Sequence, residues 1–105
     1  MKILFDQGTP VPLRRFLADH IVVTAFERGW SMLKNGDLIR EAEADGFDLL
    51  VTTDTNLKYQ QQMQGRAIGI VVLRSTSWPK IQLKISSVTA GIATVGPGGY
   101  LEIQI

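Results

Sequence analysis

Short apolar runs, each ended by polar or turn-forming residues, recur along the chain and predict strands. Strands that are buried on both faces of a parallel sheet read as continuous apolar segments rather than alternating ones. Residues 2–6, 20–24, 48–53 and 67–73 have this character. Residues 100–105 alternate apolar with polar side chains, which predicts a strand with one solvated face at an edge of the sheet.

Segments with helical spacing of apolar residues lie between these predicted strands. A short helix is expected to begin at Pro10 and to end near Asp19, because proline suits an opening turn. A second helix is expected over residues 35–45, capped by the side chain of its first residue and ended by Gly46. Residues 26–34 have no clear period and predict a loop.

The second half of the chain contains two more predicted helices. The polar residues 56–64 predict a short one. After Pro79, apolar residues recur at intervals of four, three, four and three, which predicts one continuous amphipathic helix that Gly96 and Pro97 end. These apolar positions are Ile81, Ile85, Val88, Ile92 and Val95.

Alternation of strands and helices predicts a three-layer α/β fold with a mostly parallel sheet and helices on both faces. The expected strand order is 2-1-3-4, with the fifth strand beyond the fourth. With 105 residues, the chain is expected to form one domain over residues 1–105. The winding changes direction between the first and third strands, and ligands of such sheets bind outside the carboxyl ends there.

Composition narrows the possible partners only in part. The net charge is +1, which does not favour a strongly basic nucleic-acid binder, so any contact with a polyanion has to be local. The chain has no Cys, which excludes disulfides and thiolate metal sites and favours a cytoplasmic location. No apolar run approaches the roughly 18 residues of a membrane span, so no membrane partner is expected.

Aspartates follow the two strands that flank the expected switch point. Asp6 ends the first strand and Asp54 follows the third. Either residue alone would usually serve a turn or a helix cap, but two neighbouring carboxylates repel each other unless a cation lies between them. Asp37 could reach the same edge, and Glu41 could extend the cluster. A helix dipole also favours an acid at Asp37, and Glu41 equally suits a solvated surface.

The residue types in this cluster favour one kind of metal and one reaction class. Carboxylate oxygens without His or Cys select Mg²⁺ or Mn²⁺ over zinc, and such ions support hydrolysis of phosphodiesters. Thr53 and Asn56 could support the site by binding metal-bound water or a phosphate oxygen. Arg14, Lys34 and Lys58 could hold a nucleic-acid backbone, although each also suits a solvated surface.

Three stretches resemble the PIN-like domains, in particular a compact bacterial branch related to the toxin-type ribonucleases of toxin-antitoxin pairs. They are residues 2–6 with Pro10, residues 35–39 with Ala42, and residues 50–54. The resemblance covers most of residues 1–60 and implies a metal-dependent ribonuclease fold. It places metal-binding and catalytic roles on Asp6, Asp37 and Asp54, with RNA as the substrate and an antitoxin-like protein as a partner.

The chain departs from this branch directly after the first aspartate. The branch commonly has Glu and Asn there, whereas this chain has Gln7 and Gly8. The missing carboxylate implies weaker metal binding, so a catalytically weakened relative is one alternative.

A second alternative is a non-catalytic interaction or homodimerisation module of the same fold. Its supporting features are Trp30, Met32 and Leu33 in the predicted loop and Trp78 before the last predicted helix. Such residues more commonly cover a core.

Two further readings use the same aspartates in other ways. A receiver-like domain would use Asp54 as phosphoacceptor, but no second acid adjoins Asp6 and no Lys ends the last strand. A phosphatase of the haloacid dehalogenase type requires a second Asp shortly after the first for its acid/base step, and this chain has none after Asp6. Both are therefore less favoured than the nuclease reading.

Overall fold

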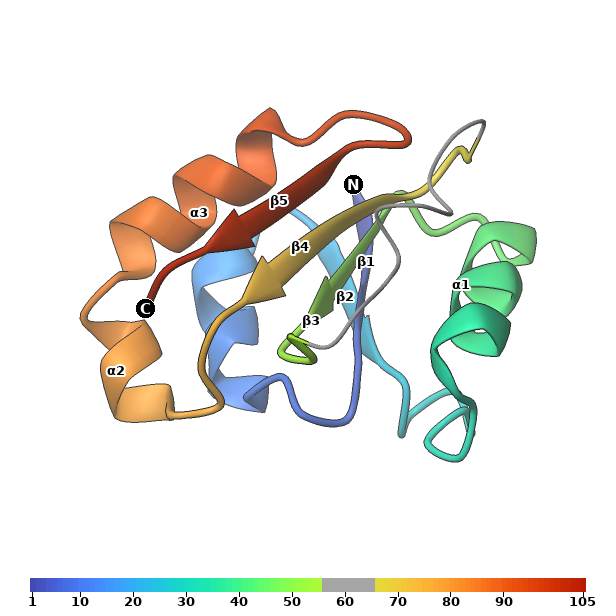
Figure 1. Ribbon diagram of the computed structural model, residues 1–105, viewed down its shortest axis with the longest axis horizontal. Coiled ribbons are helices and arrows are strands. Elements are labelled where there is room, and N and C mark those ends of the chain that lie inside the picture. Colours follow the sequence, from blue (N-terminus) through green and yellow to red (C-terminus); the bar gives the residue numbers. More distant parts are fainter. Residues whose placement is uncertain (56–65) are drawn as a thin grey trace.

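Five parallel strands form the middle layer of the computed structural model, which describes residues 1–55 and 66–105 (Figure 1). The strands are β1 (Lys2–Phe5), β2 (Ile21–Thr24), β3 (Leu49–Thr52), β4 (Gly69–Leu73) and β5 (Tyr100–Ile103). Their order in the sheet is β2-β1-β3-β4-β5, and every neighbouring pair is parallel. The predicted three-layer α/β fold and its strand order are confirmed.

Burial explains why the strand sequences differ between the middle and the edges of the sheet. Every residue of β3 and β4 is buried, which matches their continuous runs of Val, Ile and Leu. The edge strands are only partly covered. Ile21 begins β2 on the surface, and the exposed Glu102 interrupts β5.

Helices cover both faces of the sheet, as expected. The helical segments are the 3-10 helix η1 (Val11–Leu17) and the α-helices α1 (Asn35–Ala44), α2 (Trp78–Gln82) and α3 (Ile85–Thr94). Side chains of η1, α2 and α3 pack in one apolar cluster with Phe5, Val51 and Val71 of the sheet. Side chains of α1 pack in the other, with Leu50 and Val72. Of the helices that the structure describes, Figure 1 shows only α1 on that side of the sheet.

The prediction of one continuous helix after Pro79 is wrong. The chain forms α2 and then α3, and Leu83 and Lys84 lie between them. Lys84 has φ −115° and ψ 21°, outside the helical region. Because buried Ile81 before the break and Val88 after it both face the same core cluster, the apolar spacing continues across the break and conceals it.

One smaller difference concerns the helix predicted after Pro10. The segment after Pro10 is a 3-10 helix that ends at Leu17, two residues earlier than expected. Lys34 occupies the N-cap position of α1 with no side-chain cap hydrogen bond. The Asn35 side chain, for which a capping role was predicted, lies outside the described part of the chain. The helix predicted over residues 56–64 lies outside the described residues. Among the helices that the structure describes, none is long and apolar enough to cross a membrane.

Candidate functional site

The register of β1 and β3 brings Asp6 to the same sheet edge as the end of β3. Phe5 lies beside Val51 in the parallel pair, and the Asp6 N–H donates to the Val51 carbonyl oxygen at 3.2 Å. Asp6 is therefore level with Thr52, the last residue of β3, and Asp54 follows two residues later. This edge lies at the switch point between β1 and β3, as expected.

Two threonine hydroxyl groups hold the carboxylate of Asp6. Thr9 Oγ1 lies 2.7 Å from Asp6 Oδ1 and 2.9 Å from the Val51 carbonyl oxygen, so its single proton is shared between two acceptors. Thr52 Oγ1 donates to Asp6 Oδ2. Both threonines are buried, whereas Asp6 is half-buried. The hydroxyls therefore fix the carboxylate from its protein side and leave part of it accessible.

Asp54 is connected to Asp6 through the same hydroxyl group. The Asp54 backbone N–H donates to Thr52 Oγ1 at 3.1 Å, while that oxygen donates to Asp6. Asp54 is half-buried, as is Thr53 before it. The structure thus links the segments that carry Asp6 and Asp54 by one shared threonine.

The turn after Asp6 explains the two residues that depart from the PIN-like pattern. A Cβ atom on Gly8 would overlap Thr53 Oγ1, so a larger residue in this turn requires the Thr53 side chain to move. The Gln7 side-chain amide donates to the carbonyl oxygen of Ser31 in the loop before α1. Gln7 and Gly8 therefore have structural roles here that a Glu and an Asn would not reproduce unchanged.

The other two predicted acids lie on the exposed surface of α1. Asp37 has 55% of its side chain exposed and forms an ion pair with Arg40 one turn later on α1. Glu41 is exposed on the same helix. Within residues 1–55 and 66–105, no three acidic or histidine side chains form a group that could hold a metal ion. The structure therefore leaves Asp6 and Asp54 as the carboxylates at the switch point.

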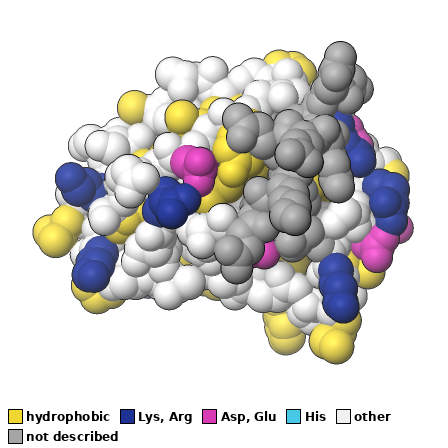
Figure 2. Space-filling view, in the orientation of Figure 1, with side chains coloured by type: hydrophobic (Ala, Val, Ile, Leu, Met, Phe, Trp, Pro, Cys, Tyr) yellow, Lys and Arg dark blue, Asp and Glu magenta, His cyan; other side chains and the backbone are white. Residues whose placement is uncertain are grey.

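The remaining predicted site residues are only partly described. Lys34 is exposed directly before α1, and Arg14 is half-buried on η1. Asn56 and Lys58 lie outside the described residues. On the coloured part of the face in Figure 2, Lys and Arg side chains are dispersed rather than gathered in one patch.

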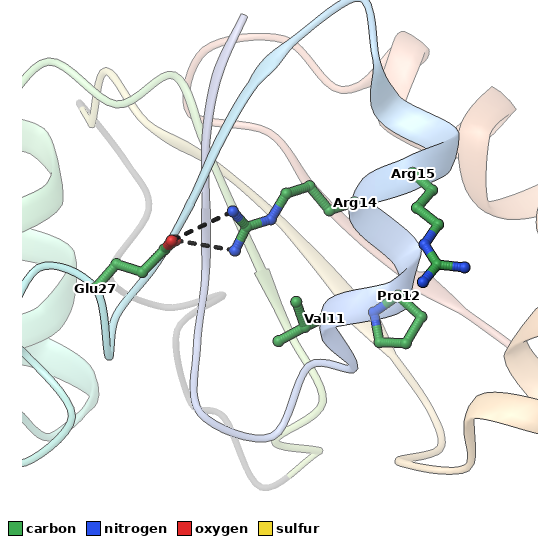
Figure 3. Close-up of a pocket in the computed structure, with 5 residues that line it drawn as sticks. All are labelled: Val11, Pro12, Arg14, Arg15 and Glu27. Atoms are coloured by element: carbon green, nitrogen blue, oxygen red, sulfur yellow. Dashed lines mark hydrogen bonds and ion pairs between the residues drawn. The ribbon is translucent and has the colours of Figure 1, made fainter.

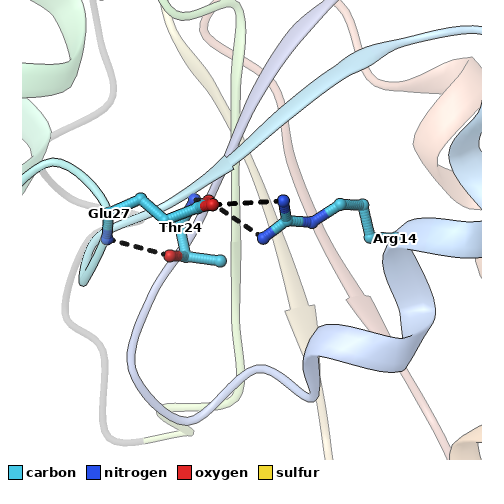
Figure 4. Close-up of polar contacts among 3 residues, drawn as sticks. All are labelled: Arg14, Thr24 and Glu27. Carbon is cyan, nitrogen blue, oxygen red and sulfur yellow. Dashed lines mark hydrogen bonds and ion pairs between the residues drawn. The ribbon is translucent and has the colours of Figure 1, made fainter.

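A polar cluster that the sequence analysis missed lies at the end of β2 (Figure 4). Glu27 Oε1 accepts the Thr24 backbone N–H at 2.9 Å, and Thr24 Oγ1 accepts the Glu27 N–H at 3.0 Å. This reciprocal pattern is that of a capping box, and its Thr-x-x-Glu spacing is the sequence signal that predicts it. Here it closes a turn after a strand.

Arg14 completes this cluster from η1. Its two terminal nitrogens lie 2.9 and 3.3 Å from the two carboxylate oxygens of Glu27, a bidentate pair. The pKa of Glu27 lies below its ordinary value, chiefly because of the hydrogen bond from the Thr24 N–H and then the bond from Arg14. The carboxylate of Glu27 is thus held in its charged form.

A pocket of about 750 Å³ opens between η1 and the turn after β2 (Figure 3). The described residues that line it are Val11, Pro12, Arg14, Arg15 and Glu27. It adjoins the Asp6 region, because Thr24 at the end of β2 pairs with Phe5, the residue before Asp6. Carboxylates and a basic pocket therefore lie along one edge of the sheet.

Comparison of the chain with known protein families, with curated proteins and with solved structures finds no significant match.

Proposed function

We propose that this protein is a PIN-like, metal-dependent nuclease that hydrolyses phosphodiester bonds of RNA in the cytoplasm. The observation that carries the proposal is the placement of Asp6 and Asp54 after adjacent strands at the switch point of a parallel sheet. The hydrogen bonds of Thr52 connect the two segments. Separate segments thus bring carboxylates to the edge where such sheets bind ligands.

The donor set at this edge fits Mg²⁺ or Mn²⁺. Mg²⁺ is usually held by one or two carboxylates together with water and substrate phosphates, so Asp6 and Asp54 suffice as protein ligands. Asp37 would join them only after giving up its ion pair with Arg40. When bound, the ion would neutralise charge on the phosphate and lower the pKa of a water molecule.

The residues around the carboxylates have supporting roles in this proposal. Thr9 and Thr52 orient Asp6, and the Thr53 hydroxyl is available beside Gly8 to hold a phosphate oxygen. A protein partner of the antitoxin kind would control such an enzyme by covering this edge.

Thermal unfolding with and without Mn²⁺ tests the proposal. Because the ion binds only the folded state, millimolar Mn²⁺ should raise the melting temperature of the wild type, and Asp6→Asn and Asp54→Asn should each abolish the increase. Asp19→Asn, an exposed aspartate outside the site, is the matched control and should keep it. The proposal is overturned if the wild type shows no increase, or if both site variants retain it.

Cleavage of a fluorescent single-stranded RNA provides the second readout. Wild type with Mn²⁺ should cleave it, and Asp54→Asn should reduce the rate by at least about a hundredfold, as expected for a residue that holds an essential ion. Asp37→Asn tests the third predicted acid. A small effect of Asp37→Asn would restrict the site to two carboxylates.

A second candidate function, a homodimerisation module, is favoured by one observation. Phe26 and Met32, in the loop between β2 and α1, are 80% and 90% exposed. Figure 2 shows apolar side chains projecting at the lower right, where this loop lies in Figure 1. Met32→Ser should then lower the dimer fraction in sedimentation at matched concentration, whereas a wild-type monomer would exclude this candidate.

The other aromatic and apolar residues that suggested an interface mainly cover the core. Trp30 packs edge-on against Phe47 with ring centroids 6.1 Å apart, and Leu33 packs against the same cluster. Trp78 lies 6.0 Å from Phe16, measured between ring centroids. Only Met32 among the four residues named for this candidate is largely exposed.

A further inference from the structure

We propose that the pocket between η1 and the turn after β2 binds a nucleotide-sized organic phosphate. Its volume of about 750 Å³ lies within the range of small-molecule sites, roughly 300 to 1,000 Å³. It would hold this ligand without any contribution from Asp6 or Asp54. The proposal therefore stands or fails separately from the proposed hydrolysis.

Among the described residues that line the pocket, the charges leave one positive charge in excess. Arg14 is neutralised by its bidentate pair with Glu27. Arg15 is exposed, lines the same pocket, and forms no ion pair with any residue of the described ranges. An anionic group can therefore bind Arg15 without displacing an existing partner, and a guanidinium group suits a phosphate because it can donate two parallel hydrogen bonds.

The Arg14–Glu27 pair gives this pocket a fixed wall. Glu27 accepts the Thr24 N–H and donates its own N–H to Thr24, which is buried at the end of β2. Arg14 is bound to this anchored carboxylate by both terminal nitrogens. The wall is thus tied to the sheet before any ligand arrives, which lowers the entropy lost on binding.

The other described residues of the lining are apolar, which favours an organic phosphate over a bare ion. Val11 is 53% exposed and lies beside Pro12 at the start of η1 (Figure 3). A phosphate ion alone would fill only a small part of the volume and would leave these side chains in water. A nucleotide would place its phosphate on Arg15 and its base against Val11 and Pro12, burying apolar surface on both sides.

Titration of isotope-labelled protein with adenosine monophosphate, followed by NMR in the presence of EDTA, tests this inference. EDTA removes divalent ions, so the result does not depend on the carboxylate site. Adenosine monophosphate should shift the amide signals of Val11, Arg14, Arg15 and Glu27. Adenosine and inorganic phosphate, titrated separately, should each bind at least about tenfold more weakly, because each provides only part of the interaction.

Two variants and one control complete the test. Arg15→Gln should weaken binding of adenosine monophosphate by about tenfold or more, as expected for loss of a charged hydrogen bond. Val11→Glu, which places a carboxylate in the pocket, should abolish it. Lys84→Gln removes another exposed cation and should leave binding unchanged.

The inference is overturned if the pocket signals do not move at millimolar adenosine monophosphate. It is also overturned if adenosine or inorganic phosphate alone binds as tightly as adenosine monophosphate, or if Lys84→Gln weakens binding as much as Arg15→Gln. RNA cleavage by a protein that fails this titration would leave the proposed function intact. Binding by a protein without nuclease activity would leave the pocket intact.

Discussion

The hydroxyl group of Thr52 donates a hydrogen bond to Asp6 Oδ2 and accepts one from the Asp54 N–H at 3.1 Å. Thr52 is 1% exposed, so water cannot replace these bonds without opening the end of β3. A hydroxyl in this position satisfies a donor and an acceptor on two different segments. The candidate site therefore depends on a side chain that is itself part of the sheet.

Energetic coupling between Thr52 and Asp6 is the first testable consequence. In a double-mutant cycle with Thr52→Val and Asp6→Ala, the free energy of unfolding should show a coupling of about 1–2 kcal/mol. Each single variant already loses the hydrogen bond to the charged carboxylate, so the double variant does not lose it a second time. Urea unfolding of the four proteins measures it. In the control cycle, Thr52→Val and Asp37→Ala should be additive within about 0.5 kcal/mol. Additivity in both cycles would contradict the hydrogen bond.

The pH dependence of stability should report on Glu43 of α1. Burial raises the pKa of this carboxyl group, but hydrogen bonds from Arg66 at 2.5 Å and the Ala67 N–H at 2.9 Å outweigh it, so the pKa lies below its ordinary value of 4.5. A group whose pKa is lower in the folded state stabilises that state above its unfolded pKa and loses this contribution as the pH falls through the folded value.

Glu43→Gln should therefore lower the free energy of unfolding by about 1 kcal/mol at neutral pH. The difference from wild type should shrink as the pH falls below 4.5. Urea unfolding at several pH values measures this difference. Glu41→Gln, on the exposed part of the same helix, controls for the change in charge. A difference that stays constant or grows at low pH would contradict the assigned contacts.

Three glycines provide a test of close packing. A Cβ atom at Gly69 would lie 2.8 Å from the backbone oxygen of Gly96, whereas one at Gly91 would meet only the ends of the Ile103 and Leu101 side chains, at 2.7 and 3.0 Å. Backbone yields less easily than a side-chain end, so Gly69→Ala should destabilise the protein by about 2–3 kcal/mol and more than Gly91→Ala.

Gly36→Ala is the matched control for these substitutions. Its Cβ would have only Arg40 Nη1 nearby, at 3.8 Å, and the residue lies in α1. The free energy of unfolding should stay unchanged or rise by up to about 1 kcal/mol, because alanine favours the helix. Thermal unfolding of the three variants gives their order of stability. An equal loss of stability for Gly69→Ala and Gly36→Ala would contradict the packing described.

Removal of the Glu27 side chain should expose the edge strand β2. Glu27 accepts the Thr24 N–H, which otherwise would be free to pair with a strand of another molecule. Glu27→Ala should therefore increase self-association with concentration, measured by light scattering. Glu27→Gln keeps an oxygen acceptor and should remain closer to wild type. If both variants behave as wild type, Glu27 does not protect this edge.

The fold could be predicted from the sequence because the central strands have a recognisable pattern of apolar residues. Leu49–Thr52 and Gly69–Leu73 are buried on both faces, so their side chains are apolar without interruption. The alternation of strands and helices along the chain and the right-handedness of the crossovers then limit the possible strand orders. The same logic placed Asp6 and Asp54 at one edge, since Asp6 directly follows β1 and Asp54 lies two residues after the end of β3.

Features that depend on side chains from distant segments could not be predicted in this way. The break at Leu83 and Lys84 leaves no gap in the apolar spacing, because both helices pack on one core cluster. The pairing of Arg14 with Glu27 joins residues on different elements. Asp37 was expected at the sheet edge from its position in the chain, yet Arg40 on its own helix is its partner.

The location of the shared threonine on an inner strand has a dynamic consequence. β1 and β3 are each flanked by strands on both sides, and local opening of a sheet begins at its outer strands. The amide protons around Val51 and Thr52 should thus exchange with solvent only at the rate of whole-molecule unfolding. Any agent that detaches β2 or β5 alone would leave the carboxylates in register, so loss of the site would coincide with loss of the fold.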